Sequence, residues 1–155
     1  MKWDLEERTE DAVVSYLKDV TDGSIRISAA WDRKEPEFPC AIVHAGESEP
    51  VSEEAAWHDA RMIAVEVAVM TEGVDELDDS GEILRTAREI NAAARSEIIN
   101  ALAVSNLNAQ LVAQGVADIA FSMAQLANCT RSVEEERYLV STLTVGVLAE
   151  PVTGS

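Results

Sequence analysis

The sequence predicts an α+β fold: a two-layer sandwich with helices packed on a mainly antiparallel sheet of about five strands. Three observations predict it. Apparent strands occur in runs, with a helix before the first run and two helices between the runs. Residues Ala60–Thr71 alternate between two side-chain sets, as a strand with two distinct faces does. Residues Asp79–Val104 carry an apolar stripe roughly 120° wide, typical of a core-facing helix. Strand runs with helices collected on one side indicate the α+β class.

The N-terminal third predicts a helix followed by two strands. Residues Trp3–Val20 place apolar side chains at spacings of three, four and seven, with acidic residues near the start, where the helix dipole favours them. Residues Ser24–Trp31 alternate as a half-buried strand. The proline-containing segment Asp32–Pro39 predicts a loop, read as a long hairpin connection to a second strand at Cys40–Ala45.

The middle of the chain carries the clearest strand and the longest helix. An acidic, turn-rich loop is predicted at Gly46–Ala56. In the following strand the β-branched set should face the helices. In the long helix, Asp79 and Glu82 have the spacing of a capping box. The predicted core-facing stripe comprises Ile83, Leu84, Ala87, Ile90, Ala94, Ile98, Ala101 and Leu102.

The C-terminal part predicts a short helix and two strands, in one domain over residues 1–149. The tail 150–155 is predicted to be flexible. The predicted elements are a helix at Asn106–Gln114 ended by Gly115, a strand through Ile119, Phe121 and Met123 with a bulge before Leu126, a charged hairpin loop at Arg131–Glu136, and a strand at Tyr138–Ala149.

Charge is the strongest compositional feature. The 155 residues include 29 acidic and 12 basic side chains, giving a formal net charge of −17. Neutralising phosphates requires patches of Lys and Arg, so this balance argues against nucleic-acid and anionic-membrane surfaces. Two cysteines do not make a disulfide framework, and no stretch approaches the roughly 18 apolar residues of a membrane span. We expect a soluble protein made in a cytoplasm, without a secretory signal.

No motif predicts a catalytic, cofactor or metal site. Cys40 and His44 on one strand would lie about 13 Å apart, too far to share an ion. The segment Asp75–Gly81 resembles a calcium loop, but the twelfth position would be Ala87 where a bidentate Glu is needed. The pair His58–Asp59 has no nucleophile motif near it. We therefore expect no cofactor and no enzymatic activity.

Aromatic residues beside the two predicted loops are the candidate interface. Trp31, Phe38 and Trp57 flank the segments Asp32–Pro39 and Gly46–Ala56, away from the periodic core stripes. Aromatic anchors are enriched at subunit interfaces, and long loops in small domains are often functional. Packing at the edge of the core is the competing interpretation.

The order of elements resembles that of the tail terminator and tail-completion proteins of long-tailed bacteriophages. The matching features are the acidic N-terminal helix, the hairpin of Ser24–Trp31 and Cys40–Ala45, the long Ala60–Thr71 strand, the Asp79–Val104 helix, the short helix and the closing hairpin through Ala149. No single functional residue carries over, because the resemblance is one of pattern.

The resemblance implies a structural virion protein of the tail or neck, assembled as a ring of typically six copies. Such a ring caps the head-proximal end of the tail tube, stops its polymerisation and joins the tail to the head-side connector. DNA passes through its lumen without specific binding, and an acidic lumen would repel it. Three alternatives stay open: a head–tail connector or stopper, a small non-viral ligand-binding or enzymatic α+β domain, and an adaptor that binds a basic partner.

Overall fold

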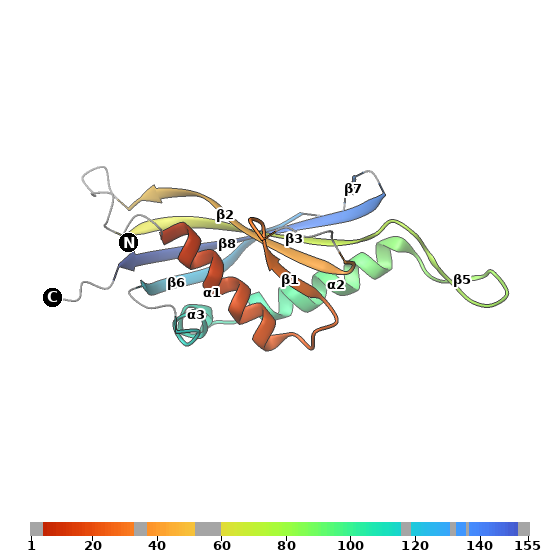
Figure 1. Cartoon of the computed structure of the whole chain (residues 1–155), viewed down its shortest axis with the longest axis horizontal. Coiled ribbons are helices and arrows are strands. Elements are labelled where there is room, and N and C mark those ends of the chain that lie inside the picture. The colour runs from red at the N-terminus through yellow and green to blue at the C-terminus, as the bar shows by residue number, and fades with distance from the viewer. Residues whose placement is uncertain are drawn as a thin grey trace.

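The computed structural model describes residues 5–32, 37–51, 60–115, 119–130, 133–135 and 137–151. Within them, helices pack on a six-stranded, mainly antiparallel sheet, which confirms the predicted α+β class (Figure 1). The strand order is β1-β2-β3-β8-β6, β7 pairs with β8, and β4 and β5 form a separate two-stranded sheet. The elements are α1 (Leu5–Val20), β1 (Arg26–Ala29), β2 (Cys40–Pro50), β3 (Arg61–Glu72), β4 (Glu76–Leu77), β5 (Ile83–Arg85), α2 (Ala87–Leu102), α3 (Leu107–Val112), β6 (Ile119–Cys129), β7 (Val133–Glu135) and β8 (Tyr138–Pro151).

Strand β3 lies at the centre of the sheet and confirms the predicted alternation. It pairs antiparallel with β2 on one side and with β8 on the other. Its β-branched residues face the helices and are buried, whereas Met62, Ala64 and Glu66 on the opposite face are exposed. The buried set is Ile63, Val65, Val67 and Val69.

The three helices pack on different strands of the sheet. Helix α1 packs on β1 and β2, α2 on β3 and β8, and α3 on β6. The Tyr16 hydroxyl of α1 donates a hydrogen bond to the Ala101 carbonyl of α2 and so joins the two long helices. The start of α1 and the end of β8 lie at the end of the molecule opposite to β4 and β5 (Figure 1).

The predicted start of the long helix is wrong by eight residues. Helix α2 begins at Ala87, and its capping box is formed by Thr86 and Glu89. The same spacing recurs at Thr86 and Glu89, seven residues after Asp79. Gly81, which lies two residues after Asp79, has a φ of +88° that breaks a right-handed helix. Residues 83–85 therefore form β5, and Ile83 and Leu84 of the predicted stripe are exposed.

The predicted hairpin between the first two strands is also wrong. Strand β1 pairs with β2 in parallel, with Arg26 opposite Cys40 and Ala29 opposite Val43. The connection must therefore return along the length of β1 before β2 begins. Periodicity identified both strands but carries no information on their relative direction.

Smaller differences concern the ends of strands. Strand β2 continues to Pro50, so the predicted loop at Gly46–Ala56 starts as strand; residues 52–59 lie outside the described residues. The charged loop at Arg131–Glu136 contains β7, which pairs with β8. Strand β8 runs to Pro151, two residues into the predicted tail. The short helix is confirmed as α3. The bulge predicted just before Leu126 is displaced, because the register of β6 against β8 shifts between Phe121 and Met123 and again between Leu126 and Asn128.

Candidate assembly surface

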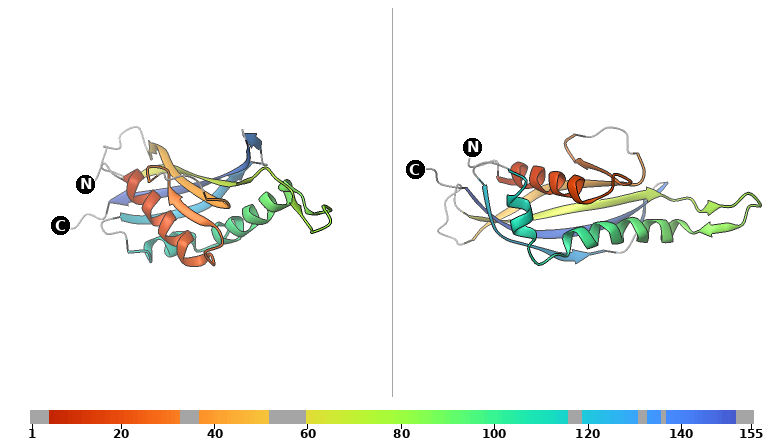
Figure 2. Two further views of the ribbon diagram at one scale, coloured as in Figure 1. Left: turned by 45° about the vertical axis from the view of Figure 1, so that its right-hand side comes forward. Right: turned by 90° about the horizontal axis from the view of Figure 1, so that it is seen from below.

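Residues 74–85, called the arm below, form a hairpin that extends beyond the end of the sheet (Figures 1 and 2). The arm is held by local polar contacts. The Asp78 carboxylate accepts hydrogen bonds from the backbone N–H groups of Ser80 and Glu82, at 2.9 Å each. Hydrogen bonds from Ser80 and then from Glu82 lower the pKa of Asp78, which keeps it ionised as an acceptor. Arg85 pairs with Glu76 across the two strands at 2.8 Å.

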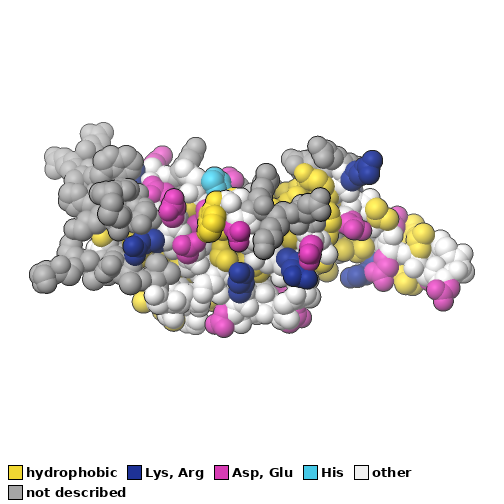
Figure 3. All heavy atoms as spheres, viewed as in Figure 1, with side chains coloured by type: hydrophobic (Ala, Val, Ile, Leu, Met, Phe, Trp, Pro, Cys, Tyr) yellow, Lys and Arg dark blue, Asp and Glu magenta, His cyan; other side chains and the backbone are white. Residues whose placement is uncertain are grey.

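The arm exposes apolar side chains that a free hairpin has no means of burying. Val74, Leu77, Ile83 and Leu84 are 64%, 54%, 57% and 58% exposed. Hydrophobic and acidic side chains lie side by side on the arm in Figure 3. A two-stranded hairpin is only marginally stable in water, and clustered exposed apolar residues mark contact sites. The arm is therefore a candidate contact element.

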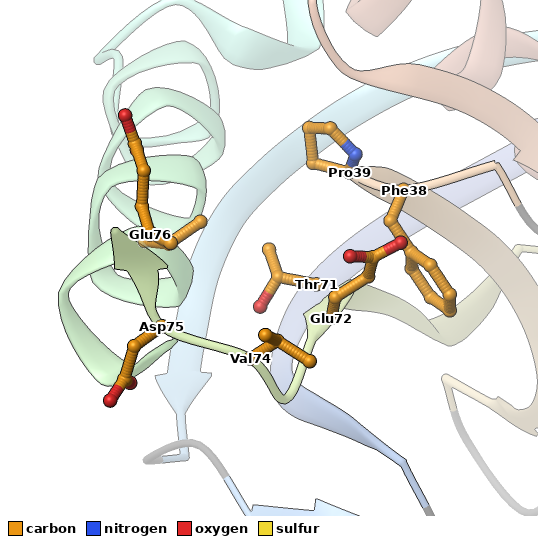
Figure 4. Close-up of a pocket in the computed structure, with 8 residues that line it drawn as sticks. Phe38, Pro39, Thr71, Glu72, Val74, Asp75 and Glu76 are labelled. Carbon is orange, nitrogen blue, oxygen red and sulfur yellow. The ribbon is translucent and has the colours of Figure 1, made fainter. Parts of the chain in front are cut away.

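A pocket of about 340 Å³ opens at the base of the arm (Figure 4). Phe38 and Pro39, which directly precede β2, lie across it from Thr71, Glu72 and Val74. The Phe38 ring also packs on the Tyr138 ring, with centroids 5.8 Å apart. The lining residues are Phe38, Pro39, Thr71, Glu72, Val74, Asp75, Glu76 and Ile90.

Two of the three pocket carboxylates have partners within the chain. Asp75 accepts a hydrogen bond from the backbone N–H of Ala87 at 2.7 Å, which fixes the base of the arm to the start of α2. Glu76 is held by Arg85. The pocket thus combines apolar walls with an acidic rim whose geometry is set by the arm.

The structure describes two of the three predicted interface residues and places them apart. Trp31 follows β1 and is 73% exposed. Phe38 is partly buried and lines the pocket. Since Ala29 pairs with Val43, Trp31 and Phe38 lie roughly 20 Å apart along β2 at 3.3 Å per residue. Trp57 lies outside the described residues.

The edge of β2 beyond β1 is closed by charged side chains, a feature that periodicity did not reveal. Buried Glu10 of α1 accepts a hydrogen bond from the Ala45 N–H at 2.8 Å, next to the bulge in β2. Arg61 donates to the Ser48 carbonyl at 3.2 Å and to its hydroxyl at 2.8 Å. Backbone groups that already have side-chain partners cannot pair with an added strand, so this edge is protected from strand addition.

The possible metal ligands and thiols of the described residues lie in different surroundings. The described residues contain no group of three or more His, Cys, Asp or Glu side chains arranged to hold a metal ion. Burial raises the pKa of the Cys40 thiol to about 11, whereas Cys129 is exposed. His44 lies 3.8 Å from the Glu10 carboxylate and is more than half exposed.

Comparison with known proteins gives no family. No protein-family model matches the chain, and a search of curated proteins finds no match. Among the described helices, none has both the length and the apolar character needed to cross a membrane.

Proposed function

We propose that this protein is a ring-forming structural protein of a bacteriophage tail, the terminator that caps the head-proximal end of the tail tube. In this role it stops tube polymerisation and joins the tail to the head-side connector. The resemblance of element order supports the proposal in part: an N-terminal helix, three strands of the main sheet, two helices and closing strands follow one another in the described chain, with β4 and β5 inserted before α2. The first two strands are parallel and so do not form the hairpin of the predicted pattern.

The arm is the single observation that carries the proposal. Four large apolar side chains on it are more than half exposed, and the hairpin projects from the sheet instead of folding back on it. A projecting element that meets a different face of the next copy makes a heterologous contact, the type that builds a ring when the rotation between copies closes. A ring of subunits with a net charge of −17 each also fits a lumen to which DNA does not adhere.

Light scattering across protein concentrations, with and without tail tubes from the same genome, tests the proposal. We expect the protein to form a ring of defined mass, alone or on the tubes, and electron microscopy to show the rings at one tube end. The double variant Leu77→Ser, Ile83→Ser should stay monomeric and folded, because both side chains are exposed. Val112→Ser on α3, 50% exposed, is the matched control and should assemble normally.

The outcomes separate the alternative functions. A monomer at every concentration that ignores tail tubes contradicts the proposal and favours a ligand-binding or enzymatic domain. A ring that ignores the tubes but binds the head-side connector identifies a connector or stopper instead. A ring that forms equally well from the arm double variant refutes the role given to the arm.

A further inference from the structure

The tip of the arm is a turn held by the side chain of one residue. Oδ1 of Asp78 accepts hydrogen bonds from the Ser80 N–H at 2.9 Å, from the Ser80 hydroxyl at 2.7 Å and from the Glu82 N–H at 2.9 Å. The backbone of Asp78 adds two more, because its N–H donates to the Glu82 carbonyl at 2.8 Å and its carbonyl accepts from the Gly81 N–H at 3.0 Å. Every hydrogen bond named in this turn therefore involves Asp78.

This turn sets the register of the two strands of the arm. Because Asp78 is bonded to Glu82, the next residues outward are Leu77 and Ile83, which are paired in the ladder of β4 and β5. Residues directly opposite each other across two strands share one face. The short ladder is irregular between Glu76 and Leu77, so strand pairing alone specifies this register weakly. The turn therefore decides that the exposed Leu77 and Ile83 side chains lie side by side.

The rest of the domain holds the base of the arm but not its tip. Asp75 fixes the base to the start of α2. Beyond it, β4 and β5 make their main contacts with each other, and the hairpin projects away from the sheet (Figure 2). A two-stranded hairpin is only marginally stable in water. Ordering a flexible segment on binding costs affinity, whereas a segment already held in its bound shape avoids this cost.

We propose that Asp78 is the positioning residue of the arm, holding Leu77 and Ile83 as one preformed apolar pair for the contact between copies. The inference rests on the proposed function, in which the arm makes that contact. Asp78 acts through the two apolar side chains, because its hydrogen bonds fix the turn between them. Removing its carboxylate should weaken assembly while leaving every apolar residue of the arm in place.

The assembly constant of Asp78→Ala, measured by light scattering with and without tail tubes, tests the proposal. We expect each contact to weaken about tenfold, the loss that follows when one residue has to be ordered on binding. Asp78→Asn keeps a side-chain acceptor for the same hydrogen bonds, so its constant should stay within about threefold of the wild type. Asp79→Ala is the matched control: it removes a neighbouring charge but keeps Asp78, and it should change the constant less than about twofold.

Amide hydrogen exchange separates this positioning role from a role in overall stability. At a concentration where the copies stay apart, the Ser80 and Glu82 amides should exchange about tenfold faster in Asp78→Ala, since both lose a charged acceptor. The urea midpoint should stay unchanged, because the arm lies outside the hydrophobic core. Unchanged exchange at both amides would overturn the assignment, and so would a urea midpoint that falls together with the assembly constant.

The failure of this inference is distinguishable from failure of the proposed function. If the wild type forms rings and Asp78→Ala forms them with the same constant, the ring stands and the positioning role is refuted. An equal loss in Asp78→Ala and Asp79→Ala, or in Asp78→Ala and Asp78→Asn, would show an effect of charge and would refute it as well. If the wild type is monomeric under all conditions, both proposals fall.

Discussion

Replacing Asn91 with Ala should destabilise the fold more than any other polar substitution discussed here. Asn91 lies on α2, fully buried, between β3 and β8. Its side-chain amide donates to the Thr71 hydroxyl at 3.0 Å and to the Leu139 carbonyl at 3.2 Å, and its oxygen accepts a hydrogen bond from the Ser141 hydroxyl. One side chain therefore links the helix to the two central strands.

The expected loss follows from the groups left without partners. In Asn91→Ala, the Ser141 hydroxyl and the Leu139 carbonyl lose a partner, and each buried unsatisfied group costs roughly 1–3 kcal/mol. Thr71 is also buried and loses its donor. Arg95 still donates to the Ser141 oxygen at 3.3 Å, but it offers no acceptor for the Ser141 hydroxyl proton. We therefore expect a loss of about 2–4 kcal/mol in the free energy of unfolding. That is a large share of the roughly 5–15 kcal/mol typical of such a domain.

Urea unfolding at fixed protein concentration measures this loss, with an unchanged m-value as the sign of unchanged two-state behaviour. Asn108→Ala is the matched control. Asn108 is partly buried and donates one long hydrogen bond, 3.4 Å, to the Phe121 carbonyl. Its loss should be about 1 kcal/mol or less. A loss below about 1 kcal/mol for Asn91→Ala, or equal losses in both variants, would refute the reasoning about the network.

Three further predictions test local features. Thr86→Ala should lower the free energy of unfolding by about 1 kcal/mol, because it removes the cap of α2. Asp79→Ala, at the cap predicted from the sequence, should leave the unfolding midpoint unchanged. A larger loss for Asp79→Ala than for Thr86→Ala would instead support a helix that starts at Asp79. In a thiol titration at pH 8, Cys129 should react fast and Cys40 should react only in urea. Fast reaction of both thiols would show that the start of β2 is accessible to solvent. Burial raises the Cys40 pKa from 9.0 to about 11, so the free energy of unfolding should fall as pH rises between these values, a slope that Cys40→Ser should remove.

The sequence was most informative where one local pattern had one interpretation. In β3 the alternation places Ile63 and Val65 toward the helices and Met62 toward the other face, and no competing register buries as much apolar surface. The same holds for α1, whose apolar spacing predicted the buried Leu5, Val13 and Leu17. These elements needed only burial of a face, which sequence periodicity encodes directly.

At the start of α2 the sequence offers two possible helix caps, and tertiary contacts determine which one is used. The spacing of a capping box occurs at Asp79 and again at Thr86, and both patterns precede apolar residues. Helix α2 starts at the second because Asp75 accepts the Ala87 N–H and because α2 must lie over β3 and β8. Residues 79–85, which the sequence pattern had placed inside a helix, instead form the second half of the arm, the main candidate contact element.

The candidate site was likewise predicted in part from the sequence and determined in part by tertiary contacts. Sequence analysis named Trp31 and Phe38 from their aromatic character, but the pocket beside Phe38 depends on residues 71–76 and on Ile90, which are distant in the chain. Buried Glu10 and Asn91 were equally unforeseen, because each polar side chain is satisfied by backbone groups of strands that only the folded chain brings near. Periodicity therefore determined which faces are buried, whereas strand direction, polar pairing and the pocket were decided by long-range contacts that no local pattern records.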